Sequence, residues 1–458
     1  MKIINLQSVS LLTALTLGSL SSVGFSQTIE IGGDFDLIYK GSIGIESWAY
    51  PQEAIHKSHK DFKNTVVSDL DLTLQTPYDL NMKMKPRLIL DVDDVDTDQF
   101  ETADLRMYGQ SRSRLYFEDL FVDYFAERFE LRAGLQTFSW KTVESLSWAD
   151  VLNQSDAQVD FFDAPKFGDL ATRLRLVMTE EEDQYLELYY LPYFSPTHYP
   201  TTGSRSDLFS LTPTYVSNDR DKVTYGSEDE QLRTQYAIRY TFGLFESIDA
   251  SAFFFHGYDR SPILKPGNPI FSQDISGNPE IVGAEMVQHY EPAYMGGFTF
   301  TGEIDSWLIK GEGLYHQYEK DSIILKQTRP YFAYTLGTEY TLFEPIVDNQ
   351  DLGIIVEAIG TTDAGIDLDE LLNFKPFNNH LFGGLRYTFN NISDRSILLG
   401  AFSSYLDYEI VGQLTYEERL FELFKVKLGG QLLSGNKKSP LRQFESSSRA
   451  ESSLMWNF

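Results

Sequence analysis

Along most of this chain apolar and polar residues alternate one by one, which is the pattern of a β-strand with two different faces. The segment 82–93 puts methionine, proline, leucine and valine on one face and lysine, arginine and aspartate on the other. The segment 128–138 alternates in the same way, with Phe129 and Leu131 opposing Glu130 and Arg132. Segments of about ten residues with this period are typical of transmembrane barrel strands, which face lipid on one side and water on the other.

About 18 segments share this pattern, and an even number of strands brings both ends of a barrel to its periplasmic side. The expected strands lie at 35–49, 64–76, 81–93, 112–125, 127–138, 169–179, 184–194, 231–243, 247–258, 291–301, 305–318, 330–342, 351–360, 380–391, 395–406, 407–418, 420–433 and 448–458.

The connections between these segments differ in length in a regular way. Short polar connections lie at 76–80, 126–127, 180–183, 245–246, 303–306, 391–394 and 418–419, and long ones at 94–111, 139–168, 195–230, 259–290 and 361–379. A soluble β-sandwich array, the main alternative for an aromatic-rich β chain, has no reason to keep long and short connections at opposite ends. The predicted fold is therefore all-β, a transmembrane antiparallel β-barrel of about 18 strands.

Both ends of the chain favour export to an outer membrane. Met1-Lys2, an apolar run at 11–20 and small residues near Ser26 predict a signal peptide at 1–26, followed by a single barrel domain at 27–458. The apolar run is about half of the ~20 residues that a membrane-spanning helix needs. The last strand closes on Phe458, as in outer-membrane barrels, and this resemblance implies recognition of Phe458 by the barrel assembly machinery.

Composition narrows the partners and the compartment. The chain has no cysteine, 14% aromatic residues and a net charge of −29, which becomes −30 when Lys2 leaves with the signal peptide. A chain this acidic is a poor candidate for nucleic-acid binding, and its aromatic residues fit the two interfacial girdles of a barrel. The expected location is the outer membrane of a Gram-negative bacterium, with lipid and lipopolysaccharide as partners.

A barrel of this size leaves an aqueous channel, and the inward-facing residues then carry the function. Arginines at 112, 114, 128 and 132 have few expected carboxylates beside them, so they favour a basic stripe that guides anions and gives a modest anion preference. The alternative, pairing of inward arginines and glutamates that stiffens the wall, stays open. The expected basic lining is Lys83, Lys85, Arg87, Arg112, Arg114, Arg128, Arg132, Arg173 and Arg175, and the acidic lining is Glu130, Glu312, Glu339 and Glu357.

Two connections stand out by their composition. The run with Asp93, Asp94, Asp96 and Asp98 is a calcium candidate. It lacks the glycine and final glutamate of an EF-hand, so a solvated acidic loop is the favoured interpretation, and no metal site is predicted.

The connection 139–168 is too apolar for a loop exposed to solvent. We expect it to fold inward as a constriction or to pack across the mouth; contact with a partner or lipopolysaccharide outside the barrel is the alternative. Its aromatic residues include Trp140, Trp148, Phe161 and Phe162.

The segment 131–140 (LRAGLQTFSW), followed by Ala149-Asp150-Val151-Leu152-Asn153, resembles the R-x-G-[KR]-Q-x-x-x-W-G … D-x-x-N pattern of outer-membrane barrels related to the alginate export porin. The segments 118–124, 337–340, 351–357 and 377–390 are similar to further strands of such barrels. The resemblance covers about half of the chain and implies an 18-stranded barrel for passive passage of a solute or polymer. Leu135 replaces the family's lysine or arginine, and Lys141 replaces its glycine, which indicates a differently shaped loop.

Enzymatic chemistry finds little support. The chain has no G-x-S-x-G elbow, zinc-ligand pair or phosphate loop, and His316 with Glu312 on one strand face is more typical of a structural pair. We therefore expect no enzymatic activity and no cofactor. The favoured function is passive passage of a hydrophilic solute, small or polysaccharide, with an anionic one among the candidates. The alternative is a closed barrel that binds or adheres through its long aromatic loops.

Overall fold

The computed structural model describes residues 27–30, 35–51, 62–92, 113–157, 164–180, 183–200, 214–226, 230–244, 247–273, 279–319, 330–362, 379–404, 409–421, 423–436 and 440–458. The expected signal peptide lies outside these residues. The calcium candidates Asp93, Asp94, Asp96 and Asp98 also lie outside them, as do Arg112, Phe161 and Phe162.

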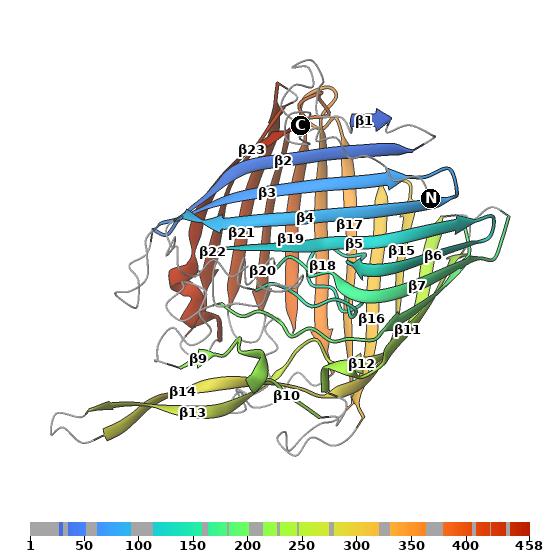
Figure 1. Cartoon of the computed structure of the whole chain (residues 1–458). Helices are drawn as coiled ribbons and strands as arrows, with labels where there is room; N and C mark the ends of the chain where they lie inside the picture. Colours follow the sequence, from blue (N-terminus) through green and yellow to red (C-terminus); the bar gives the residue numbers. More distant parts are fainter. Residues whose placement is uncertain are drawn as a thin grey trace, which may run out of the picture.

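Eighteen strands form one closed antiparallel barrel (Figure 1). All of the expected strands are confirmed, and their bounds move by four residues at most. They are β2 (Asp36–Ala49), β3 (Phe62–Gln75), β4 (Leu80–Asp91), β5 (Arg114–Ala126), β6 (Phe129–Gln136), β7 (Asp169–Val177), β8 (Tyr185–Leu191), β11 (Gln235–Leu244), β12 (Ile248–Tyr258), β15 (Pro292–Ile304), β16 (Trp307–Tyr318), β17 (Tyr331–Phe343), β18 (Asp351–Thr361), β19 (His380–Thr388), β20 (Ser396–Ser404), β21 (Ile410–Leu420), β22 (Phe424–Ser434) and β23 (Arg449–Asn457).

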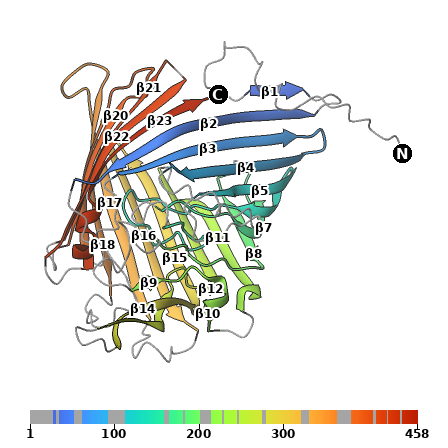
Figure 2. The same ribbon diagram turned by 60° about the vertical axis from the view of Figure 1, so that its left-hand side comes forward.

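The barrel closes where β23 pairs with β2 (Figure 2). The backbone of Phe458 exchanges two hydrogen bonds with that of Gly41, with N···O distances of 2.8 and 2.9 Å. A side chain at Gly44 would put a Cβ 2.2 Å from the carbonyl oxygen of Leu454, so only glycine permits this approach of the two strands. Leu454 and Trp456 are exposed on the outer face beside the seam.

Connection length separates the two ends of the barrel. The short turns, such as Asp305-Ser306 with φ 53° at Asp305, lie at the end that carries the C terminus. The long connections lie at the other end, as the sequence predicts. The described residues contain no helix long and apolar enough to cross a membrane, an observation that does not bear on strands.

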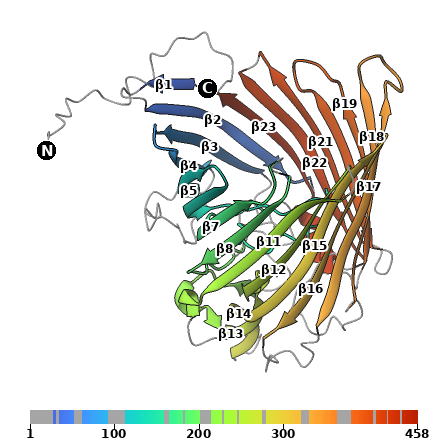
Figure 3. The same ribbon diagram turned by 90° about the vertical axis from the view of Figure 1, so that its right-hand side faces the viewer.

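A second, four-stranded sheet lies at the end opposite the C terminus (Figures 1 and 3). The sequence placed only loops at 195–230 and 259–290, because two of these strands have two residues each and Pro266 and Pro269 interrupt another. Its strands are β9 (Tyr215–Val216), β10 (Thr224–Tyr225), β13 (Ile263–Gln273) and β14 (Pro279–Tyr290). The remaining elements are β1 (Gln27–Glu30), which pairs with β2, and the 3₁₀ helices η3 (Arg220–Lys222), η4 (Glu230–Leu232) and η5 (Pro440–Ser447).

The strands have an apolar outer face and a mixed inner face. On β16, Ile309 and Tyr315 are exposed on the outside, while Lys310, Glu312 and His316 alternate with them and are buried. On β18, Ile354 and Val356 are exposed, whereas Glu357 is buried. Large apolar side chains exposed over the whole outer face are expected where lipid, not water, is the solvent.

Candidate functional site

The connection between β6 and β7 crosses the interior of the barrel. Six strands (β8, β11, β12, β15, β16 and β17) separate β7 from β18 along the wall. Yet residues 142–149 of this connection hydrogen-bond to Glu312 of β16 and Glu357 of β18, both on the inner face. We call residues 137–167 the inward loop; residues 158–163 of it are outside the described part.

Glu312 binds the inward loop through both carboxylate oxygens. The amide of Thr142 donates to Oε1 at 2.7 Å, and the amides of Trp148 and Ala149 donate to Oε2 at 2.9 and 3.1 Å. The hydroxyls of Thr142 and Ser147 add bonds of 3.2 and 2.7 Å. The side chain is fully buried, and these five donors compensate the charge that burial would otherwise penalise.

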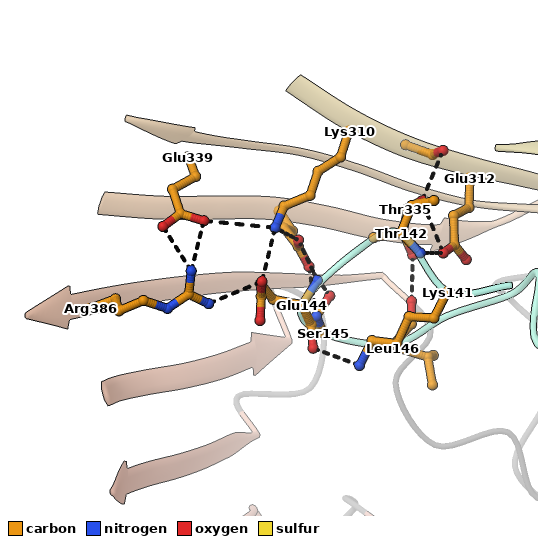
Figure 4. A network of polar contacts seen from close by, with 12 residues as sticks. Lys141, Thr142, Glu144, Ser145, Leu146, Lys310, Glu312, Thr335, Glu339 and Arg386 are labelled. Atoms are coloured by element: carbon orange, nitrogen blue, oxygen red, sulfur yellow. Dashed lines mark hydrogen bonds and ion pairs between the residues drawn. The ribbon is translucent and has the colours of Figure 1, made fainter. Parts of the chain in front are cut away.

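Glu357 holds the tip of the same loop. It accepts the amides of Glu144 and Ser145, both at 2.8 Å, and the Ser145 hydroxyl. Lys310, buried beneath the tip, has its ammonium 3.2 Å from Glu144 and 3.7 Å from Glu357 (Figure 4). Arg386 of β19 completes the network through Glu144 at 3.0 Å and Glu339 at 2.9 Å.

The pKa of Glu144 responds to this network. Partial burial acts to raise it, but hydrogen bonds and charge interactions with Arg386 and Lys310 outweigh burial and lower the pKa below its ordinary value. The tip carboxylate is therefore ionised where it meets the two cations.

Two residues of the D-x-x-N motif fix the base of the inward loop. Asn153 accepts the amide of Phe138 at 2.6 Å and donates to the carbonyls of Gln136 and Phe167, both at 2.9 Å. Asp150 accepts the amide of Trp140 at 3.0 Å and pairs with Lys166 at 2.5 Å. The sequence flagged this motif only as a family resemblance; the structure shows that it clamps the two arms of the loop together.

The side of the loop that faces the wall is apolar. Trp140 and Leu152 are buried against the inner faces of β8 and β12, where Trp140 packs edge-on to Tyr189 at 5.5 Å between ring centroids and tilted against Phe253 at 5.1 Å. Trp148 packs against the same cluster. The members are Phe138, Trp140, Ala149, Val151, Leu152, Ala171, Tyr189, Leu191, Ala237, Phe253, Phe255, Ala293, Met295, Leu314, Tyr318, Tyr331 and Ala333.

The rest of the inner wall is charged and paired. Asp71 lies 3.4 Å from Lys40 and 3.7 Å from Lys83, which links β2, β3 and β4. Glu118 lies 2.5 Å from Lys85 and 2.8 Å from Arg87. Lys427 of β22 lies 3.0 Å from Glu451 of β23. We call the wall formed by β2–β6 and β19–β23 the open half. We call the wall formed by β7, β8, β11, β12 and β15–β18 the covered half.

The expectation that Arg114 and Arg132 have few carboxylates beside them is wrong. Arg114 lies 2.6 Å from Asp156, a residue of the inward loop that strand spacing could not place there. Arg132 pairs with Asp123 across the β5–β6 ladder and, at 3.1 Å, with Glu130. The pairing alternative accounts for these arginines.

Other expected lining residues take different positions. Arg128 lies in the turn Glu127-Arg128, one residue before β6, and its side chain is exposed. Arg173 bonds to Glu130 and lies 3.8 Å from Glu187. Arg175 stacks on Tyr185, with its guanidinium carbon 3.9 Å from the ring centroid.

The four-stranded sheet and η5 meet above the open half. Val216, Leu264 and Met286 of the sheet pack with Val411 and Leu433 of β21 and β22. These contacts bring the chain from the β8–β15 side of the barrel across the mouth. We call the described residues 192–200, 214–226, 259–273 and 279–291 the cap. Leu441 and Phe444 of η5 belong to the same cluster.

The cap and the inward loop are joined. Arg260 donates from Nε to the carbonyl of Val151 at 3.1 Å, and the Thr197 hydroxyl donates to Gln154 at 2.6 Å. His198 is buried beside them, and burial, with the charges of Arg114 and Arg220, lowers its pKa to about 3, so its ring is neutral at physiological pH. Phe194 and Tyr189 are buried, because aromatic packing builds the interior of the cap and the loop.

The described residues contain no cluster of three or more histidine, aspartate or glutamate side chains able to hold a metal ion.

Comparisons with known proteins bear on the fold. No protein-family model and no curated protein sequence matches the chain. Among solved structures it is similar to Wzi of Escherichia coli, described as an outer-membrane protein involved in group 1 capsule assembly and a carbohydrate-binding β-barrel. The identity is 9%, the match covers 93% of this chain and 84% of that chain, and the TM-score is 0.50.

Two proteins of Acinetobacter baumannii show weaker similarity. OccAB4 has 10% identity over 93% of this chain and 98% of that chain, with a TM-score of 0.49. The outer-membrane channel DcaP has 12% identity over 95% of this chain and 100% of that chain, with a TM-score of 0.41. The fold shared with Wzi and the exposed apolar outer face together place this chain among the β-barrels of the Gram-negative outer membrane.

Proposed function

We propose that this protein is an outer-membrane channel for passive passage of a hydrophilic solute, narrowed on one side by the inward loop. One observation carries the proposal: the loop is anchored on Glu312 and Glu357 of the covered half, with further contacts to Arg386 and Arg114, while the side chains of Lys40, Lys85 and Lys427 in the open half remain in contact with water. A water-lined path beside a fixed constriction is what passive passage requires.

The loop is held firmly enough to act as a fixed part of the pore. Glu312 and Glu357 together accept eight hydrogen bonds from it. Hydrogen bonds to charged groups contribute about 1.5–3 kcal/mol each, and the aromatic cluster beneath the loop adds apolar burial. Unanchored loops have neither contribution.

The resemblance to barrels related to the alginate export porin supports passage of a solute or polymer, without enzymatic chemistry. This chain departs from the family pattern at two positions, Leu135 and Lys141. Leu135 is buried, and the Lys141 ammonium donates to the carbonyl of Glu144 at 2.9 Å, which closes the turn at the loop tip. The lysine in place of the family's glycine thus stabilises the turn within the loop. We propose a related pore shape for this chain and leave the individual solute open.

A closed barrel that binds a ligand outside the cell is the second candidate. The observation that favours it is the cap, whose residues cross the mouth and pack on β21, β22 and η5. A carbohydrate ligand would fit this candidate by analogy with Wzi, whose description names carbohydrate binding.

Single-channel recording in planar lipid bilayers separates the two candidates. We expect discrete conductance steps from the purified protein. A variant in which residues 142–147 are replaced by Gly-Gly should give larger steps, because the segment that reaches Glu312 and Glu357 is gone.

The matched control shortens the periplasmic turn by replacing residues 345–348 with Gly-Gly, and it should conduct like the unmodified protein. Silent bilayers from folded, heat-modifiable barrels would reject the channel and leave the binding candidate.

A further inference from the structure

The lysine ion pairs of the open half are layered, with the cation toward water and the carboxylate toward the wall. The side chain of Lys40 is 64% exposed and that of its partner Asp71 is 16% exposed. The side chain of Lys85 is 35% exposed and that of Glu118 is 12% exposed, and Lys427 and Glu451 have the same two exposed fractions. Arg132 is likewise more exposed than Asp123.

This order has a structural cause. The carboxylates also contact a second cation: Glu118 binds Arg87, Asp71 binds Lys83, and Glu451 lies near Arg449. The two cations come from both neighbouring strands at Asp71, from β4 alone at Glu118, and from β22 and β23 itself at Glu451. In each case the shared carboxylate is held close to the wall. The long lysine side chains then extend past it into the lumen.

Among the described residues, the carboxylate is the more exposed partner in four pairs that involve arginines of the open half: Arg87–Asp69, Arg386–Glu144, Arg419–Asp394 and Arg449–Glu451. All four cations are arginines, whereas every described lysine pair of the open half follows the order. In the covered half Lys310 is buried because the inward loop lies over it. The cationic layer therefore belongs to the open half, where lysines repeat along the pore axis. Lys83 and Lys85 are two residues apart on β4, and Lys425 and Lys427 are two apart on β22, a spacing of about 7 Å.

We infer that the open half presents a cationic contact layer to solutes that carry carboxylate, phosphate or sulfate groups, although its charges are paired and the chain is acidic. This inference rests on the proposed channel function and names its solute class. A wall whose charges are balanced in number still attracts anions at contact distance, because the nearer charge dominates and the buried partner is farther away. Charges outside the lumen are screened within about 10 Å at 0.1 M salt.

The test is the reversal potential across a potassium chloride gradient, with Lys83→Gln, Lys85→Gln and Lys427→Gln combined. Each substitution leaves a carboxylate that still has a cation, since Lys40, Arg87 and Arg449 remain. No buried charge is stranded, so the barrel should fold. We expect the unmodified protein to prefer chloride over potassium by about two- to fivefold, and the triple variant to lose that preference or reverse it.

Arg128→Gln is the matched control, because it removes one cation from an exposed turn at the periplasmic end, away from the paired lysines of the layer; its reversal potential should equal that of the unmodified protein. Potassium selectivity in the unmodified protein, or an unchanged chloride preference in the triple variant, would overturn the inference while leaving the channel intact. Silent bilayers would instead reject the channel itself, so the two failures are distinguishable.

Discussion

The covered and open halves of this barrel use the same residue types in opposite ways. In the covered half, Glu312 and Glu357 accept amide and hydroxyl hydrogens of the inward loop, and aromatic side chains fill the space beneath it. In the open half, carboxylates such as Glu118 and Glu451 bind cations from neighbouring strands, and no described segment lies over Lys40 or Lys427 to bury them.

The difference shows that a lumen-facing carboxylate can have either of two structural roles. Where a crossing segment offers several backbone N–H groups, it becomes an anchor that excludes water. Where two cations share it and no described segment covers them, it pairs with side chains that extend past it toward the lumen. The same alternating strand pattern can therefore encode a filled region and a water-lined region within one barrel.

Substituting Glu312 and Glu357, which anchor the inward loop, should have the largest effect on the difference between the covered and open halves. In the double variant Glu312→Gln and Glu357→Gln, each site loses its charge and gains NH₂ donors that face N–H groups of the loop. At about 1.5–3 kcal/mol for each bond to a charged group, the loop should leave the wall. We expect single-channel conductance to rise about twofold or more, with noisier open levels, because the constriction no longer stays in one place.

Glu451→Gln provides the comparison within the open half, where the carboxylate contacts Lys427 and Arg449 and no loop amide. It should alter selectivity without increasing the conductance. If the double variant has the same single-channel conductance and the same open-level noise as the unmodified protein, the inward loop is held by other contacts.

The clamp at the base of the loop should have an intermediate effect. Asn153→Ala removes one accepted and three donated hydrogen bonds, the longest of them to Asp169 at 3.4 Å, for a loss of about 1–3 kcal/mol for the groups left unsatisfied. Trypsin cleavage after Lys141 and Lys166 in the folded barrel should become about tenfold or more faster, because cleavage follows the population of the detached loop.

Asn64→Ala is the matched control, because it removes an asparagine of β3 that is far from the inward loop. Asn64 accepts a hydrogen bond from the Ser47 hydroxyl of β2. Equal cleavage rates for the two variants would mean that Asn153 does not control the position of the loop.

The sequence predicted the strands well because a period of two is a local property, and it predicted an inward-turning loop because its aromatic content is also local. It could not join that loop to its anchors, since Ser145 and Glu357 are 212 positions apart. Glu312 and Glu357 could be assigned to the inner face, but not as acceptors of backbone amides. The D-x-x-N motif was the one local signal for the clamp, but the role of Asn153 depends on hydrogen bonds to residues 14–17 positions away, which the motif does not encode.

The smallest effect should be the acid response of the loop tip. Because its pKa is lowered in the folded state, Glu144 stabilises the tip above the ordinary glutamate pKa of about 4.3, and that contribution is lost as pH falls through the lowered value. Below that window the protonated carboxyl no longer pairs with Lys310 and Arg386, and two cations face each other beneath the tip. Channel noise should therefore increase in acid, and Glu144→Gln should show at neutral pH the noise that the unmodified protein shows only in acid.

Other carboxylates titrate over the same range, so the quantity to measure is the difference in channel noise between Glu144→Gln and the unmodified protein as the pH is varied. Parallel curves for the two would place the acid response elsewhere in the lumen and leave Glu312 and Glu357 as the anchors that matter.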